Sequence, residues 1–154
     1  MVATTGAELL PSQSVEALRE HLIAKATVLT PNLPEALLLL NGGTTSGQIH
    51  AVGSTDELQT LAVSLKSLGA EWVLLKGGHC PFTKDGKLAE TDEEREVVVN
   101  VLVGPRGELA LFESEYQQTR STHGTGCSLA CELPLFPQPD WPDVLRKTTT
   151  QACA

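Results

Sequence analysis

The chain has 154 residues, of which 41% are apolar and 19% charged, and its net charge is −8. This length and composition suit a single soluble globular domain with a sizeable core. The acidic balance and the lack of a Lys/Arg cluster argue against binding to a nucleic-acid backbone. The longest apolar run, residues 36–40, is far too short to span a bilayer, and residues 1–12 lack the features of a signal peptide.

The four cysteines fit neither a compact disulfide framework nor a pair of zinc ligands. They are Cys80, Cys127, Cys131 and Cys153. Cys127 and Cys131 are spaced to share one face of a helix, but no His pair lies nearby to complete a metal site. The sequence therefore predicts free thiols, a reducing compartment and a cytoplasmic location.

The first predicted elements are a helix and a strand. Residues 14–26 carry apolar side chains at helical spacing, namely Val15, Leu18, Leu22 and Ile23. Ser14 is the expected N-cap of this helix. Residues 27–31 form a short apolar run that Pro31 stops, which predicts a buried strand.

Two further helices and a second strand follow. A helix is predicted to begin near Pro34 and to close at Gly42 or Gly43. Residues 54–69 predict a third helix, because they open with a Ser-x-x-Glu capping box, continue with apolar positions at helical spacing and stop at a glycine. Residues 71–79 predict a strand that leaves through a Gly-Gly turn.

The segment TPNLPEA, residues 30–36, follows the first predicted strand and carries the first candidate ligands. Asn32 and Glu35 are three residues apart, and their side-chain oxygens suit a hydrated Mg²⁺ ion. The alternative is purely structural: Asn32 caps the helix, and Glu35 lies in its first turn, where the helix dipole favours a carboxylate. The residues alone leave both interpretations open.

The segment LKGGH, residues 75–79, lies at the end of the second predicted strand. Ligands of open α/β sheets gather at the carboxyl ends of strands, where Lys76 could place its charge on a phosphate group. The alternative is a solvated lysine before a turn. His79 is interpreted as structural.

Residues 84–114 change from a helical to an alternating pattern. Lys-Asp-Gly and Pro-Arg-Gly turn signals flank the β-rich runs 97–103 and 108–112, which predicts antiparallel hairpins. The acidic run 91–96 suits a solvated edge that keeps a strand from pairing elsewhere. The preceding alternation of strands and helices predicts an α/β fold, with a mostly parallel sheet flanked by helices and an antiparallel addition.

The segment THGTGCSLA, residues 122–130, combines a Gly-rich turn with the start of a helix. Gly124 and Gly126 permit a tight turn, and the free N–H groups of the helix would then face an anion. Such a turn suits the charge on a phosphoryl group in transfer. Cys127 lies where a thiolate is favoured, so it is a candidate base for a substrate hydroxyl. The alternative is a glycine turn followed by a small buried cysteine.

Taken together, the three segments place a metal carboxylate, a phosphate-binding lysine and an anion turn at strand ends of one sheet, a set that suits phosphoryl transfer. TPNLPEA, LLKGGH and STHGTGCSLA, in this order, also resemble hydroxymethylpyrimidine/phosphomethylpyrimidine kinase, a thiamine-biosynthesis enzyme of the ribokinase-like superfamily. The resemblance covers roughly residues 1–130. It implies a ribokinase-like fold, ATP and Mg²⁺ as cofactors, and hydroxymethylpyrimidine or its monophosphate as the small-molecule substrate.

The resemblance also implies a role for each candidate residue. Cys127 would be the catalytic base, and Lys76 would contact the ATP phosphates. Asn32 and Glu35 would serve the Mg²⁺–phosphate region. Three residues would help to form the anion hole: Gly124, Thr125 and Gly126. Pyridoxal-type kinases are relatives that usually carry Asp in this motif, so Cys127 favours the pyrimidine branch.

The chain departs from the family in two places. The family has an N-terminal half, with most of the substrate pocket, ahead of the part that matches residue 1. After Ala130 it continues in an Ala-rich helix, whereas residues 131–154 here carry prolines that cannot sustain one. We therefore expect a partial kinase domain, residues 1–130, and a poorly ordered Pro-rich tail, residues 131–154.

Such a piece is expected to be inactive alone and to bind ATP weakly. Without the family's N-terminal half, one edge of the sheet is expected to be unpaired, which favours poor soluble expression or a homodimer. Two alternatives remain open: a non-catalytic truncated isoform or gene-model fragment, and a pyridoxal kinase-like protein.

Overall fold

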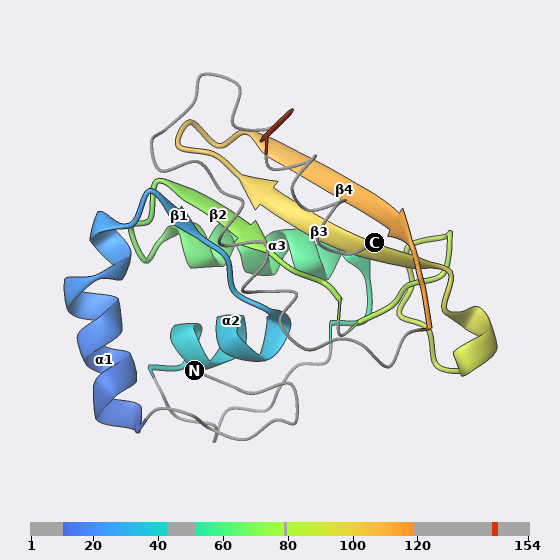
Figure 1. Cartoon of the computed structure of the whole chain (residues 1–154), viewed down its shortest axis with the longest axis horizontal. Coiled ribbons are helices and arrows are strands. Elements are labelled where there is room, and N and C mark those ends of the chain that lie inside the picture. The colour runs from blue at the N-terminus through green and yellow to red at the C-terminus, as the bar shows by residue number, and fades with distance from the viewer. Residues whose placement is uncertain (1–10, 43–51, 79, 119–142, 145–154) are drawn as a thin grey trace. The chain divides into compact units, whose positions relative to one another are not determined.

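The computed structural model describes residues 11–42, 52–78, 80–118 and 143–144. The chain divides into two compact units, Met1–Tyr116 and Gln117–Ala154, and nearly all described residues belong to the first. The expected division near residue 130 stays a prediction. The elements follow in the order α1 (Ser12–His21), η1 (Ile23–Lys25), β1 (Val28–Leu29), α2 (Leu33–Leu40), α3 (Thr55–Lys66), β2 (Trp72–Leu75), η2 (Asp92–Glu94), β3 (Val97–Val103) and β4 (Leu109–Glu115), as Figure 1 shows.

The four strands form one mixed sheet in the order β1-β2-β3-β4. β1 and β2 are parallel, because α2 and α3 lie between them in the chain and carry it back to the same end of the sheet. β2 and β3 are antiparallel, and so are β3 and β4. α3 packs on β2 and β3, and α2 packs on α3. The predicted α/β class, with helices flanking a sheet that has an antiparallel hairpin, is confirmed. The sheet was predicted to be mostly parallel, but among the described strands only the β1–β2 pairing is parallel, so the sheet is mixed.

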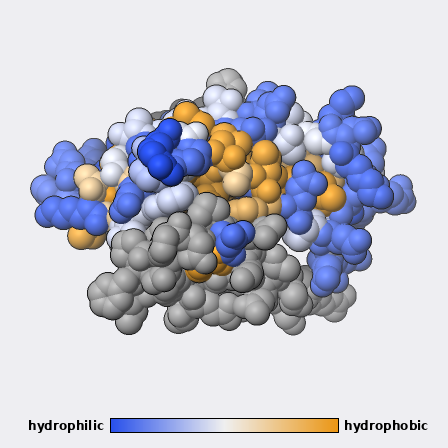
Figure 2. All heavy atoms as spheres, turned by 90° about the horizontal axis from the view of Figure 1, so that it is seen from above, coloured by the Kyte–Doolittle hydropathy of each residue, from blue (hydrophilic) through white to orange (hydrophobic). Residues whose placement is uncertain are grey.

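The hydrophobic core lies between α3 and one face of the sheet. Its fully buried members include Leu58, Ala62, Leu65, Val73, Leu75, Val99 and Val101. Trp72 and Leu74 alternate with these core residues along β2 and are also buried, so β2 is buried on both faces. On the edge strand β4, by contrast, Leu109 and Leu111 are exposed. In Figure 2, apolar side chains occupy the middle of the upper face, between hydrophilic side chains at either end.

The first helix and the first strand both differ from their predictions. α1 begins at Ser12, and the N–H of Ser14 donates to the Pro11 carbonyl at 2.9 Å, so Ser14 lies inside the first turn and is not the N-cap. The helix was predicted to continue to residue 26, but it ends at His21 and a 3₁₀ turn follows it. Leu22, which was assigned to the apolar face of the helix, is exposed. The strand predicted at 27–31 is only the two residues of β1, and both are half-buried.

The second and third helices begin and end close to the predicted positions. α2 has a proline in its first turn and ends before Gly42, which has a φ of +66°. At the start of α3, the Ser54 hydroxyl accepts a hydrogen bond from the Glu57 N–H at 3.3 Å. The Glu57 carboxylate accepts from the N–H of Gly53, at 2.7 Å, and not from that of Ser54. Only half of the predicted capping box therefore forms.

The predicted antiparallel hairpin is confirmed, although its second strand runs over Leu109–Glu115 and not over 108–112. β3 and β4 pair over seven residues each, from Val97↔Glu115 to Val103↔Leu109. The Gly104 N–H donates to the Glu108 carbonyl at 2.8 Å and closes the turn. None of the described helices is long and apolar enough to cross a membrane.

Candidate functional site

The candidate site begins where β1 and β2 end side by side. The parallel register pairs Val28 with Trp72, and it continues beyond the strands as a bridge between Asn32 and Lys76. The Lys76 N–H donates to the carbonyl of Pro31 at 2.9 Å. Two of the three predicted segments, TPNLPEA and LKGGH, therefore meet at the carboxyl end of the parallel strand pair, where α/β proteins bind ligands.

Asn32 and Glu35 form a complete capping box at the start of α2. The Asn32 Oδ1 accepts from the Glu35 N–H at 2.8 Å, and the Glu35 Oε2 accepts from the Asn32 N–H at 3.0 Å. Both side chains therefore have the structural task that the sequence left open as an alternative. The second carboxylate oxygen of Glu35 makes no hydrogen bond with another described residue.

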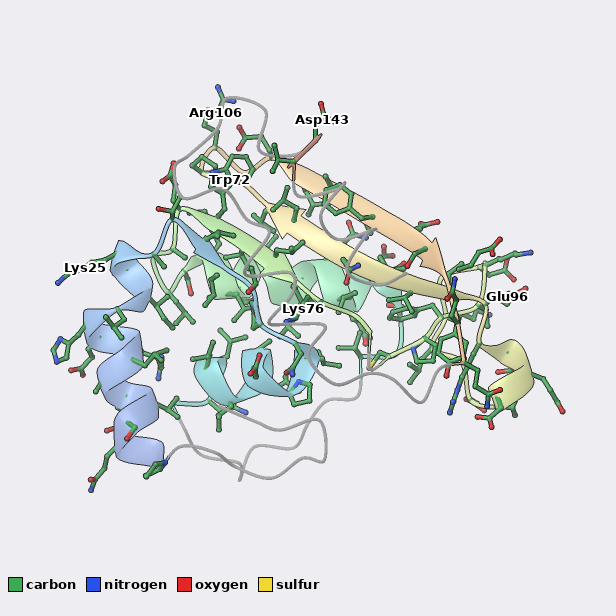
Figure 3. The ribbon with its side chains drawn as sticks, in the orientation of Figure 1. Lys25, Trp72, Lys76, Glu96, Arg106 and Asp143 are labelled. Carbon is green, nitrogen blue, oxygen red and sulfur yellow. The ribbon has the colours of Figure 1, made fainter. Side chains whose placement is uncertain are left out.

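Lys76 follows the last residue of β2 and is half-buried. Figure 3 places it between the end of β2 and the beginning of α2. Within the described ranges, its ammonium group makes no hydrogen bond and no ion pair. A lysine whose backbone is fixed and whose charge has no protein partner among these residues is suited to an anionic ligand.

Two residues beside Lys76 are important for the geometry and were missed from the sequence. Gly77 approaches β3 so closely that a Cβ atom there would lie 2.0 Å from the Val99 carbonyl oxygen. The Gly77 N–H donates to the Oδ1 of Asn100 at 3.1 Å. The sequence did contain a signal for Asn100, namely one amide within the apolar run 97–103.

The Mg²⁺ ligands proposed from the sequence can be tested against this geometry. Among the described residues there is no group of three or more His, Cys, Asp or Glu side chains that could hold a metal ion. Mg²⁺ in nucleotide sites usually keeps several waters and uses one or two carboxylates together with substrate phosphates. The uncapped oxygen of Glu35 at the strand end fits that pattern, so Glu35 remains a candidate.

The third segment cannot be placed in the same way. Gly124, Thr125, Gly126 and Cys127 lie outside the described residues.

Cys80, the free cysteine of the described part, packs against the hydrophobic core, and burial raises the pKa of its thiol.

A separate hollow of about 450 Å³ contains none of the candidate residues. It is lined by Gly53, Thr83, Asp85, Lys87, Leu88, Glu90 and Glu94. The candidate site is therefore defined by the strand ends and not by this hollow.

Comparison with known proteins identifies the family. Residues 1–134 match the phosphomethylpyrimidine kinase family. The hydroxymethylpyrimidine/phosphomethylpyrimidine kinase of Bacillus subtilis is 33% identical over 133 residues, which are 86% of this chain and 41% of that protein. A Schizosaccharomyces pombe relative, whose name carries the same two kinase activities, is 36% identical over 137 residues, which are 88% of this chain and 24% of that protein. The chain thus spans less than half the length of these relatives.

Solved structures agree on the fold. An ADP complex of Bacillus subtilis pyridoxal kinase superposes with a TM-score of 0.66 at 26% identity, over 98% of this chain and 50% of that one. Staphylococcus aureus pyridoxal kinase with AMP-PCP gives a TM-score of 0.60 at 25% identity, over 86% of this chain and 41% of that one. The fold is ribokinase-like, and the chain belongs to the phosphomethylpyrimidine kinase family.

Proposed function

We propose that this chain supplies the phosphate-handling part of a kinase that transfers the γ-phosphoryl group of ATP to hydroxymethylpyrimidine and then to its monophosphate. The observation that carries the proposal is the contact of Asn32 with Lys76 at the carboxyl end of β1 and β2. It brings two of the three family segments together on backbone that is held by hydrogen bonds. The complexes of related kinases with ADP and AMP-PCP support ATP as the nucleotide.

Lys76 is proposed to contact the ATP phosphates. Phosphoryl transfer depends mainly on positioning and on electrostatic stabilisation of the phosphoryl oxygens. An ammonium group with no partner among the described residues can neutralise phosphate charge without first breaking an ion pair. Removal of this charge should weaken both nucleotide binding and the rate.

Glu35 is proposed to serve the Mg²⁺–phosphate region, with Asn32 holding it in place. Mg²⁺ would supply charge neutralisation across the phosphates when it is bound. The capping bond from the Asn32 N–H to one carboxylate oxygen fixes the Glu35 side chain, and the other oxygen is left for a metal-bound water.

The chemical step is assigned to the segment that lies outside the described residues. Cys127 would accept the proton of the substrate hydroxyl as the oxygen attacks the γ-phosphorus. The backbone N–H groups of Gly124, Thr125 and Gly126 would stabilise the phosphoryl charge during transfer. Proton removal and charge stabilisation would then be adjacent in one short segment.

A pyridoxal kinase-like activity is the second candidate. It is favoured by the solved neighbours, since two of them are pyridoxal kinases at 25% and 26% identity. The relatives named as hydroxymethylpyrimidine kinases are more similar, at 33% and 36% identity, and they favour the pyrimidine substrate. The two candidates share the phosphate chemistry and differ only in the acceptor.

The proposal also predicts that the 154-residue chain alone binds MgATP weakly and has no steady kinase turnover. Its match covers 41% of the Bacillus subtilis enzyme, so most of that enzyme has no counterpart here. An acceptor that is not held in place loses the proximity contribution, which can reach about 7–11 kcal/mol. A steady turnover that depends on Cys127 would contradict this expectation.

The function is best tested in a hybrid protein, in which residues 1–130 replace the matching segment of the Bacillus subtilis enzyme. ADP release should be measured with hydroxymethylpyrimidine, its monophosphate and pyridoxal, each with MgATP. We expect turnover with both pyrimidines that is lost in Lys76→Met and Cys127→Ala. Because most of the acceptor pocket of this hybrid comes from the Bacillus subtilis enzyme, the same replacement is also made in Bacillus subtilis pyridoxal kinase. Turnover in the pyridoxal kinase hybrid alone would favour the second candidate, and two folded hybrids without turnover would refute the proposal.

A further inference from the structure

Asn100 is the only buried polar or charged side chain among the described residues, with 3% of its surface exposed. It interrupts the apolar run of β3, and both of its neighbours, Val99 and Val101, are buried valines. Burying an amide is unfavourable unless its polar atoms find partners. The partner here is the N–H of Gly77, which donates to the Asn100 Oδ1 at 3.1 Å.

The register of the sheet explains why the two residues meet. β2 and β3 pair Leu74 with Leu102 and Leu75 with Val101. One more step along the same register puts Asn100 opposite Lys76. Residues that lie opposite one another in an antiparallel pair share a face of the sheet. Asn100 and Lys76 are therefore placed on the same face, at the end of the sheet that carries the candidate site.

Gly77 needs a side-chain acceptor because its backbone has left the ordinary ladder. Its Cα lies so close to β3 that a Cβ would come within 2.0 Å of the Val99 carbonyl oxygen. On the other side, the Lys76 N–H donates to the Pro31 carbonyl at 2.9 Å. Two consecutive N–H groups thus tie this turn to β3 on one side and to the chain after β1 on the other.

We propose that Asn100 is a positioning residue for the phosphate-binding lysine. It anchors the backbone at Gly77, and so it fixes the point from which the Lys76 side chain reaches the ligand. The inference rests on the proposed function, since it assigns Lys76 to a nucleotide phosphate. A lysine stem is long and flexible, so a displaced backbone would spread the ammonium over many positions and weaken its contact with phosphate.

The test uses the 154-residue chain and two variants that remove the acceptor. Asn100→Leu has similar size without the amide, and Asn100→Ser, whose hydroxyl is too short to reach Gly77, serves if the leucine variant does not fold. Asn100→Asp keeps an acceptor oxygen at the same position. Leu102→Val is the matched control, because it truncates a buried side chain on the same face of β3 without touching Gly77.

Two quantities should be measured for each variant. The first is the hydrogen-exchange rate of the Gly77 amide, compared with the amides of β3 and β4. The second is the dissociation constant for MgATP, followed by NMR titration up to millimolar concentration. Thermal unfolding of each variant separates a local effect from a general loss of stability.

We expect Asn100→Leu to raise both the exchange rate of the Gly77 amide and the MgATP dissociation constant by about 10-fold. This is the scale of one lost hydrogen bond. Asn100→Asp should restore protection of the Gly77 amide; it is scored by exchange alone, because its added negative charge opposite Lys76 also opposes phosphate binding. Leu102→Val should lower the melting temperature and leave both quantities unchanged. An unaltered Gly77 exchange rate, or MgATP binding that is insensitive to Asn100, would overturn this inference and leave the proposed function standing. If the unmodified chain does not bind MgATP, the weak binding expected of this chain is wrong and this inference fails, while turnover of the hybrid kinase still decides the proposed function.

Discussion

The capping box at the start of α2 allows the structural role of its two residues to be separated from the proposed metal role. Asn32→Ala removes the acceptor that lies 2.8 Å from the Glu35 N–H. Loss of an N-cap costs about 1 kcal/mol, within a range of roughly 0.5–2. α2 has only eight residues and is too short to be stable without its contacts, so the loss should be visible. For a chain of this size, about 1 kcal/mol corresponds to a fall of roughly 2–4 °C in melting temperature.

Glu35→Gln is the more informative change. Glutamine keeps a carbonyl oxygen that can accept from the Asn32 N–H, so the capping box survives while the negative charge is lost. The stability cost should then be limited to the interaction of the carboxylate with the helix dipole, about 0.3–1 kcal/mol. If Glu35 serves Mg²⁺, the same variant should raise the Mg²⁺ concentration that gives the half-maximal rate.

The chain contains matched controls for both changes. Ser54→Ala removes the N-cap of α3, and Glu57→Gln removes the carboxylate that accepts from Gly53 at 2.7 Å. Neither residue has a proposed ligand role. Urea unfolding of the 154-residue chain measures the stability changes, and a Mg²⁺ titration of the hybrid kinase measures the metal role.

Only one pattern supports the proposed metal role. Glu35→Gln must shift the Mg²⁺ titration, and Glu57→Gln must leave it in place. If the two variants behave alike in the titration, Glu35 is a capping residue and nothing more. If Asn32→Ala leaves the unfolding midpoint unchanged, the magnitude assigned to the cap is itself wrong.

The remaining predictions concern three other positions. In the hybrid kinase, Cys127→Ala should lower kcat by about 10²–10⁴, the usual contribution of a general base, with little change in KM for ATP; near-normal turnover would remove Cys127 from the chemistry. Gly77→Ala should lower the free energy of unfolding by several kcal/mol, because its Cβ would meet a backbone oxygen at 2.0 Å. A Cβ at Gly78 would have nothing within 4 Å, so Gly78→Ala should change the free energy of unfolding, measured in urea, by no more than about 0.5 kcal/mol. Equal costs at the two glycines would contradict the close approach. Burial raises the pKa of the Cys80 thiol, so its contribution to stability is present below the ordinary thiol pKa and is lost as the pH rises through the higher folded value. The stability difference between the chain and Cys80→Ala should therefore change between neutral pH and about pH 10, and a constant difference would show that the thiol is not buried in solution.

Much of the fold follows from local patterns in the sequence. α2, α3 and the β3–β4 hairpin were predicted close to their observed bounds, because caps, periodicity and turn glycines are encoded within each segment. α1 and β1 were predicted less well. The start of α1 depends on Pro11, and the two-residue pairing of β1 depends on β2, which is distant in the chain.

The site shows the same division. The order of the segments TPNLPEA and LKGGH predicted their meeting at the strand ends, since the carboxyl ends of parallel strands share one edge. The sequence could not show which glycine of the Gly-Gly pair is constrained, because the constraint on Gly77 comes from a carbonyl of β3. It also gave no reason to connect Asn100 with Gly77, since that hydrogen bond exists only when β2 and β3 are in register.

The length of chain between paired strands determines the order in which the sheet is expected to fold. β3 and β4 are joined by the short turn 104–108, whereas β1 and β2 are separated by residues 30–71. Closing a long loop costs more entropy and is slower, so the hairpin should form early and the parallel pair late. The chain at the carboxyl ends of β1 and β2, where Asn32 meets Lys76, would then be the last part of the sheet to become ordered and the first to open in native-state fluctuations. A nucleotide bound there would add its binding free energy to the weakest pairing of the sheet, so the ligand would slow local opening more than it slows unfolding of the hairpin.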